Sequence, residues 1–178
     1  MDCAKGICAK AAWPNRSVTQ LMGLLRVHKR VPILFAIPTT SGTGSETTIA
    51  AVIIDAQTHR KAVMMDMFII PAYAILDPEL TVTLPPDLTA TTGMDALCHA
   101  VEAYTNHRYN TKFEDILAKR AVRLIYDNLY AAYKDGADID ARENMQNAAF
   151  YAGRAFTRGC VGYVHAIGHT LGGLYGLP

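Results

Sequence analysis

The 178 residues carry 17 basic and 16 acidic side chains, so the formal net charge is +1 at pH 7. This balance provides no basic face for nucleic acid, and a hydrophobic content of 51% is typical of a globular protein. No apolar run reaches the length of a membrane span, because the longest candidate, MFIIPAYAIL, is short and is interrupted by Pro71.

The chain carries no sign of secretion. Its four cysteines are too few and too scattered for the disulfide framework of a small secreted protein. They are Cys3, Cys8, Cys98 and Cys160. The first residues, MDCAKGICAKAAW, lack the long apolar core of a signal peptide. We therefore expect a reduced, cytoplasmic protein that binds neither nucleic acid nor membranes.

The chain up to Pro85 alternates short β-branched runs with glycine and proline, a pattern typical of strands and their turns. A short helix is predicted ahead of these runs, at residues 2–12. Buried strands are predicted at residues 31–37, 47–54, 61–66 and 72–77. We therefore expect residues 1–85 to form an α/β domain.

After Pro86 the strand pattern gives way to helical periodicity, with helices predicted at residues 94–104, 111–133 and 140–156. The second helix opens with Thr111 and Glu114 in the spacing of a capping box, and Gly136 is its stop signal. The third opens with Asp140 and Glu143 in the same relation. Small residues of this helix would let a neighbour approach closely: Ala148, Ala149, Ala152 and Gly153. We therefore expect residues 86–178 to be all-α.

A glycine-rich segment, PTTSGTGSETT at residues 38–48, follows the first predicted strand. Glycine loops at the carboxyl end of a strand can bind nucleotide phosphates through their backbone N–H groups. The segment is not a Walker A loop, because no Lys-Ser/Thr pair follows the glycines, and it is not a Rossmann fingerprint, because a strand follows instead of a helix. Two interpretations stay open: a simple connection, or a cofactor loop that uses its many hydroxyl groups.

Two pairs of side chains have the spacing of metal ligands. Asp95 and His99 are four residues apart on a predicted helix, and His165 and His169 repeat this spacing near the end of the chain. Each residue taken alone is more often structural, but one oxygen and three nitrogens from two helices can bind a divalent metal, and two such pairs in one short chain favour a metal site. Cys98 offers a thiolate as a further ligand, although it points in another direction from its helix. The other histidines are predicted to be surface residues: His28, His59 and His107.

Six segments together resemble the iron-containing (group III) alcohol dehydrogenases, in the order of that family. They are MDCAK, PTTSGTGSETT, RKAVM, AILDPELT, LPPDLTATTGMDALCHAVEAY and GYVHAIGHTLGGLYGLP. The resemblance implies a dehydroquinate synthase-like fold, α/β followed by all-α. Residues 1–85 would be the C-terminal part of a Rossmann-like nucleotide-binding domain, and residues 86–178 the N-terminal part of a helical metal-binding domain. It also implies an oxidoreductase that transfers hydride between a primary or secondary alcohol and NAD or NADP.

The resemblance assigns roles to individual residues. Asp95, His99 and His165 match ligands of the family's metal, Fe²⁺ or in some members Zn²⁺. His169 matches a histidine beside the substrate that relays a proton or positions the substrate, so the resemblance removes it from the ligand set. The residues that match cofactor contacts are Asp2, Thr39, Thr40, Thr43 and Lys61.

Two motifs of the family fall outside the sequence. The fourth metal ligand, a histidine, corresponds to the position after Pro178, and the pyrophosphate-binding GGGSP stretch corresponds to residues before Met1. We therefore expect an internal segment of a longer, homo-oligomeric enzyme that acts on a small alcohol or aldehyde. The alternatives are a catalytically inactive fragment, and a glycerol dehydrogenase-like or dehydroquinate synthase-like relative on the same fold.

Overall fold

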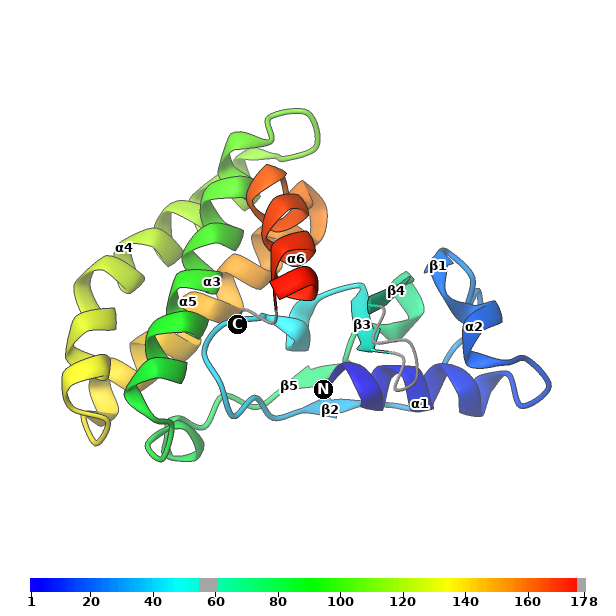
Figure 1. Cartoon of the computed structure of the whole chain (residues 1–178), viewed down its shortest axis with the longest axis horizontal. Helices are drawn as coiled ribbons and strands as arrows, with labels where there is room; N and C mark the ends of the chain where they lie inside the picture. Colours follow the sequence, from blue (N-terminus) through cyan, green and yellow to red (C-terminus); the bar gives the residue numbers. More distant parts are fainter. Residues whose placement is uncertain (55–60, 176–178) are drawn as a thin grey trace. The chain divides into compact units, whose positions relative to one another are not determined.

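The computed structural model describes residues 1–54 and 61–175, and it divides into two compact units. The first unit comprises Met1–Ala36 and Ser45–Ile75. The second comprises Ile37–Gly44 and Leu76–Pro178. Figure 1 shows the α/β elements of the first unit and the long helices of the second. In the described residues, no helix is both long and apolar enough to cross a bilayer.

The first unit is built around a three-stranded sheet with the order β1 (Gly23–Leu24), β4 (Lys61–Met65), β3 (Ala50–Ile54). β1 is parallel to β4, and β3 is antiparallel to β4. Helix α1 (Asp2–Ala12) packs against β3, and its Gly6 permits the close approach because a Cβ there would lie 2.7 Å from Ile53 Cδ1. The short helix α2 (Val18–Leu21) follows α1, and the two-residue strands β2 (Phe35–Ala36) and β5 (Tyr73–Ala74) pair in parallel.

The second unit packs three long helices along one another: α3 (Pro86–Thr105), α4 (Lys112–Lys134) and α5 (Ile139–Gly159). Their contact faces are rich in alanine, which lets the backbones approach closely. The buried alanines include Ala96, Ala100, Ala103, Ala118, Ala121, Ala148, Ala149, Ala152 and Ala155. A final helix, α6 (Tyr163–Tyr175), has no buried residue and contacts α3.

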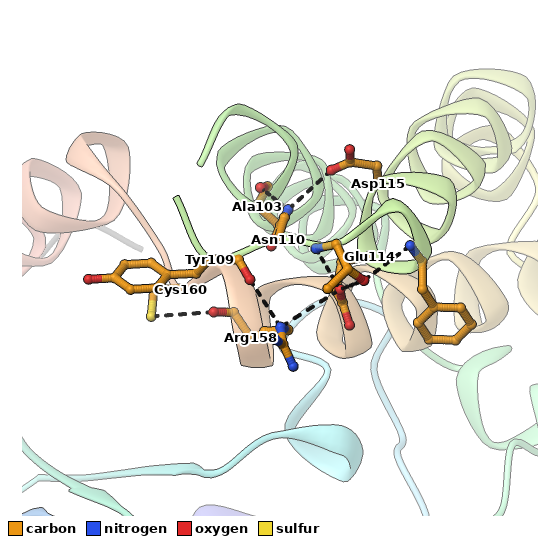
Figure 2. A network of polar contacts seen from close by, with 9 residues as sticks. Ala103, Tyr109, Asn110, Glu114, Asp115, Arg158 and Cys160 are labelled. Carbon is orange, nitrogen blue, oxygen red and sulfur yellow. Dashed lines mark hydrogen bonds and ion pairs between the residues drawn. The ribbon is translucent and has the colours of Figure 1, made fainter. Parts of the chain in front are cut away.

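A polar network fixes the end of α5 against the connection between α3 and α4, as Figure 2 shows. Arg158 Nε donates to the carbonyl of Tyr109 at 3.0 Å and lies 4.0 Å from a carboxylate oxygen of Glu114. Asn110 donates to the carbonyl of Ala103. The contacts of Arg158 therefore tie the last turn of α5 to the connection between α3 and α4 and to the start of α4.

The predicted helices are present, although α3 begins at Pro86, eight residues before its predicted start, and one predicted cap is corrected. Thr111 and Glu114 form a complete capping box at the start of α4. The third predicted helix, α5, starts earlier than Asp140, because the carboxylate of Asp138 accepts the N–H of Ala141 and makes Asp138 the N-cap.

The buried strand predicted at residues 31–37 is wrong over most of its length. Only Phe35 and Ala36 form a strand, and Ile33, Phe35 and Ile37 are exposed. Burial on both sides of a strand requires other elements packed over both faces of its sheet, and in the described residues β2 pairs only with the two-residue β5, to which the strand predicted at residues 72–77 is likewise reduced. The strand predicted from residue 47 begins at Ala50 instead, because Ser45–Thr47 form a 3₁₀ turn.

Candidate metal centre

Three potential ligands converge between α3 and α6. Asp95 and His99 lie one turn apart on α3, and His165 lies in the first turn of α6. Asp95 Oδ1 is 3.4 Å from His165 Nε2 and 3.8 Å from His99 Nε2. One donor atom from each of the three residues lies within 4.8 Å of the others. The four-residue spacing on α3 therefore brings both side chains to one face, as the sequence predicts.

Aromatic stacking holds the two imidazoles in place. The ring of His99 lies between those of Phe156 and His165, with centroid distances of 4.1 Å and 4.4 Å. The stack buries His99, whose residue surface is 6% exposed. Burial lowers the pKa of His99 to about 4, against the opposing effect of Asp95. His99 is therefore neutral at pH 7 and keeps a lone pair that can bind a metal.

The donor atoms fit a divalent transition metal. In tetrahedral coordination with bonds of about 2.1 Å, ligand atoms lie roughly 3.4 Å apart, close to the observed 3.4 Å and 3.8 Å. Nε2 of His165 is buried, and its polar neighbour is Asp95 Oδ1 at 3.4 Å, a long contact. A buried nitrogen that faces a carboxylate needs a positive charge between them, either a proton or a bound cation. Two imidazole nitrogens and one carboxylate oxygen suit Fe²⁺ or Zn²⁺.

The carboxylates beside His165 and the imidazoles beside Asp95 shift each other's pKa values. The contact with Asp95 raises the pKa of His165, while burial opposes this rise and Glu102 supports it. Burial would raise the pKa of Asp95, but the neighbouring imidazoles hold that pKa below its usual value. Asp95 is therefore an anion near neutral pH, and a divalent cation at this point would compete with the proton of His165.

Glu102 is the residue that the sequence reasoning missed. It lies on α3, and its Oε2 is 2.5 Å from His165 Nδ1. Its Oε1 accepts the N–H of Val164 at 2.7 Å. The spacing offers a signal in hindsight, because Glu102 follows His99 by three residues and therefore lies on the same face of α3.

His169 and Cys98 lie outside the ligand cluster. The ring of His169 is 5.7 Å from that of His165 and tilted by 60°, and its residue surface is exposed. Burial raises the pKa of the Cys98 thiol, with further contributions from Asp95 and Glu102, so the thiolate is disfavoured. The proton-relay role of His169 stays a prediction. His28 and His107 are exposed, as predicted, and His59 lies outside the described residues.

The glycine-rich loop belongs to the helical unit up to Gly44. A Cβ at Gly42 would lie 2.8 Å from the carbonyl oxygen of Thr92, and one at Gly44 would lie 2.7 Å from Gly153 Cα. Gly44 also has a φ of 57°. The two glycines therefore let the loop pack closely on α3 and α5, where Gln146 Nε2 also donates to the Pro38 carbonyl at 3.2 Å.

The side chains predicted to contact the cofactor are spread over both units. In the loop, Thr39 and Thr43 are exposed and Thr40 is half-buried. In the first unit, Lys61 is exposed at the start of β4, whereas Asp2 has structural partners. One oxygen of Asp2 accepts from the Ser45 hydroxyl at 2.5 Å, and the other accepts from the Val52 N–H at 2.7 Å. The cofactor contacts of all five residues stay predictions.

Two family models match the chain. The model of the iron-containing alcohol dehydrogenases matches residues 1–78, and the model of the C-terminal part of the Fe-containing alcohol dehydrogenase family matches residues 89–178. Alcohol dehydrogenase 4 of Schizosaccharomyces pombe is 43% identical over 177 residues, which are 99% of this chain and 42% of the relative. The NAD-dependent methanol dehydrogenase of Bacillus methanolicus is 46% identical over 99% of this chain and 46% of the relative.

Solved structures agree with the sequence relatives. A 1,3-propanediol oxidoreductase superposes with a TM-score of 0.93 at 41% identity, over 99% of this chain and 46% of that protein. The sulfoacetaldehyde reductase of Bifidobacterium kashiwanohense, solved in complex with NAD⁺, superposes with a TM-score of 0.88 at 32% identity. The match covers 99% of this chain and 47% of that protein. The chain thus spans less than half the length of these relatives. With two family models and these relatives covering nearly all of it, the chain belongs to the iron-containing alcohol dehydrogenase family.

Proposed function

We propose that this chain carries the metal centre and cofactor-contacting residues of an NAD(P)-dependent alcohol dehydrogenase. The observation that carries the proposal is the convergence of Asp95, His99 and His165, with the buried Nε2 of His165 lying 3.4 Å from Asp95 Oδ1. The cluster lies within the residues that match the C-terminal family model. The relatives named for methanol and 1,3-propanediol support a small alcohol, or its aldehyde in the reverse direction, as substrate.

Each residue of the centre contributes a distinct property to the proposed reaction. A bound Fe²⁺, or Zn²⁺ as the alternative, would act as a Lewis acid that lowers the pKa of the alcohol. Asp95 contributes an anionic oxygen, and the buried His99 contributes a neutral nitrogen that needs no deprotonation near pH 7. His169 is exposed one turn beyond His165, a position that suits passing the proton of the alcohol to solvent.

The proposed cofactor is NAD, with NADP as the alternative. The names of two relatives support NAD: the NAD-dependent methanol dehydrogenase and the reductase solved with NAD⁺. The contacts are proposed for the hydroxyl-rich loop and for two residues of the first unit: Thr39, Thr40, Thr43, Asp2 and Lys61. We further propose that the whole enzyme is a cytoplasmic homo-oligomer that binds no nucleic acid.

The test places the chain in a relative of full length. Residues 1–178 replace the aligned segment of the 1,3-propanediol dehydrogenase of Klebsiella pneumoniae, which is 43% identical over 177 residues. After anaerobic loading with Fe²⁺, we expect alcohol-dependent reduction of NAD⁺ or NADP⁺, and we expect Asp95→Ala to abolish it. A folded, metal-loaded chimera that reduces neither cofactor with primary alcohols, secondary alcohols or glycerol would refute the proposed activity.

A further inference from the structure

The carboxylate of Glu102 is surrounded by hydrogen-bond donors from the start of α6. It accepts the backbone N–H of Val164 at 2.7 Å, and the N–H of Gly162 also lowers its pKa. Its second oxygen lies 2.5 Å from Nδ1 of His165. The residue is buried, at 7% exposure, and a Cβ on Gly162 would lie only 3.0 Å from Oε1. A side chain of α3 therefore accepts from three groups at the start of α6: two backbone N–H groups and the ring of His165.

These contacts determine which nitrogen of His165 carries the hydrogen. An ionised carboxylate only accepts hydrogen bonds, and a backbone N–H only donates. With Glu102 accepting, Nδ1 of His165 must donate, so the lone pair of the neutral imidazole is on Nε2. Nε2 is the atom that faces the ligand cluster, 3.4 Å from Asp95 Oδ1.

We infer that Glu102 is a positioning residue for the metal centre: it holds His165 in the metal-binding tautomer and anchors the start of α6 on α3. This inference rests on the proposed function, in which His165 is a ligand. Carboxylates that accept from the second nitrogen of a ligating histidine fix its orientation and increase its basicity. Here the same carboxylate also accepts the N–H groups of Gly162 and Val164 at the start of a helix whose first turn holds no acidic residue.

The packing of α6 explains why such an anchor is needed. Within this chain none of the described residues of α6 is buried, so apolar contacts of this chain contribute little to its position. Its first residues follow the end of α5 by a link of only three residues, 160–162. That end is held by Arg158 on the Tyr109 carbonyl and by Asn106, which donates to the Gly159 carbonyl. The short link and Glu102 together hold His165 beside Asp95 and His99.

Glu102→Gln separates the two roles of this side chain. The amide has one accepting oxygen, and the backbone N–H groups of Gly162 and Val164 can only donate, so the oxygen is expected to face them. The amide NH₂ then faces Nδ1 of His165 and moves the imidazole hydrogen to Nε2. We expect α6 to stay docked while Zn²⁺ binds about 10- to 100-fold more weakly, the range measured when a partner of a ligating histidine is lost.

The readouts are chosen to distinguish positioning from a purely structural role. The ¹⁵N chemical shifts of His165 show which ring nitrogen carries the hydrogen. They are recorded on metal-free protein at a pH high enough for the imidazole to be neutral. Hydrogen exchange of the Val164 amide reports docking of α6, and Zn²⁺ competition with a chromophoric chelator reports affinity. Glu143→Gln is the matched control, because Glu143 is an exposed glutamate on α5, away from the start of α6. It should leave all three readouts unchanged.

Each outcome supports or overturns the inference. An Nδ1–H tautomer in wild type that becomes Nε2–H in Glu102→Gln, with weaker Zn²⁺ binding and a protected Val164 amide, supports it. An Nε2–H tautomer in wild type overturns it whether or not the variant folds. Equal Zn²⁺ affinity in both proteins also overturns it and leaves the proposed function intact. Failure of wild type to bind Zn²⁺ would instead count against the proposed function.

Discussion

Lys5 is a fully buried charged residue in the first unit. Its ammonium group donates to the carbonyls of Thr48 and Ala50, both at 2.8 Å, and to the Thr48 hydroxyl at 3.0 Å. Burial lowers the pKa of Lys5 to about 8, against the opposing effects of Asp2 and Glu46. The side chain therefore joins α1 to the segment before β3, at the cost of keeping a charge away from water near neutral pH.

This depressed pKa predicts a pH dependence of stability. Between about pH 8 and 10.5, the folded chain has released the proton of Lys5 while the unfolded chain still binds it. The free energy of unfolding should therefore rise with pH in this window, by about 3 kcal/mol in total. Urea unfolding at pH 7.5 and pH 10.5 should show this rise in wild type and lose it in Lys5→Met.

Lys10→Met provides the control for this measurement. Lys10 lies on the same helix, and it donates to the carbonyls of Pro14 and Arg16 without being fully buried. Its loss should leave the pH dependence unchanged. An identical rise in wild type and Lys5→Met would show that Lys5 does not titrate in this window in the folded protein.

At the scale of the elements, the glycine-rich loop depends on close packing against α3 and α5. Gly44→Ala should destabilise the helical unit, because Gly44 has a φ of 57° and its Cβ would lie 2.7 Å from the backbone of Gly153. We expect a loss of about 2–4 kcal/mol, combining the strained φ and overpacking. Thermal or urea unfolding, followed by the far-UV signal of the helices, measures it.

Gly168→Ala is the matched control, because a Cβ at Gly168 would meet nothing within 4 Å on the exposed helix α6. That change should be neutral or stabilise by about 0.5–1 kcal/mol. If Gly44→Ala were as well tolerated as Gly168→Ala, the loop would not pack on the helices as described.

The helices could be predicted from the sequence because their signals are local. Thr111 and Glu114 lie three residues apart, so their capping box is visible in the sequence and is present in the structure. The cap of α5 was misplaced by two residues, because Asp138 and Asp140 are both suitable residues and only the backbone geometry selects Asp138. Whether residues 31–37 form a buried strand depends on which distant segments pack beside them, and the local sequence does not carry this information.

The same distinction applies to the candidate site. Asp95 and His99 share a helix face, so their proximity follows from spacing, and the distances in the structure agree with it. Glu102 was missed because its role depends on where α6 begins, which is a tertiary contact. The glycines of the loop suggested a phosphate cradle, yet their observed neighbours are the helices α3 and α5.

At the scale of the whole molecule, the candidate ligands and the predicted cofactor contacts are divided differently between the two units. Asp95, His99 and His165 all belong to the second unit, whereas Asp2 and Lys61 belong to the first. Metal binding should therefore depend only on the packing of α3, α5 and α6. It can be measured on this chain directly, although the chain spans less than half the length of its relatives.

The most direct test of the central claim is a metal titration of the 178-residue chain. After removal of metals by a chelator, Zn²⁺ in air and Fe²⁺ under anaerobic conditions are added and quantified by elemental analysis. We predict one ion per chain for wild type and for His107→Ala. His99→Phe keeps an aromatic ring beside Phe156 but removes the ligand nitrogen. The affinity of this variant for the metal should fall by more than about 100-fold, which exceeds the loss typical when only the hydrogen-bond partner of a ligand is removed. A wild-type chain that binds no metal, or a folded His99→Phe chain that binds as tightly as wild type, would contradict the account.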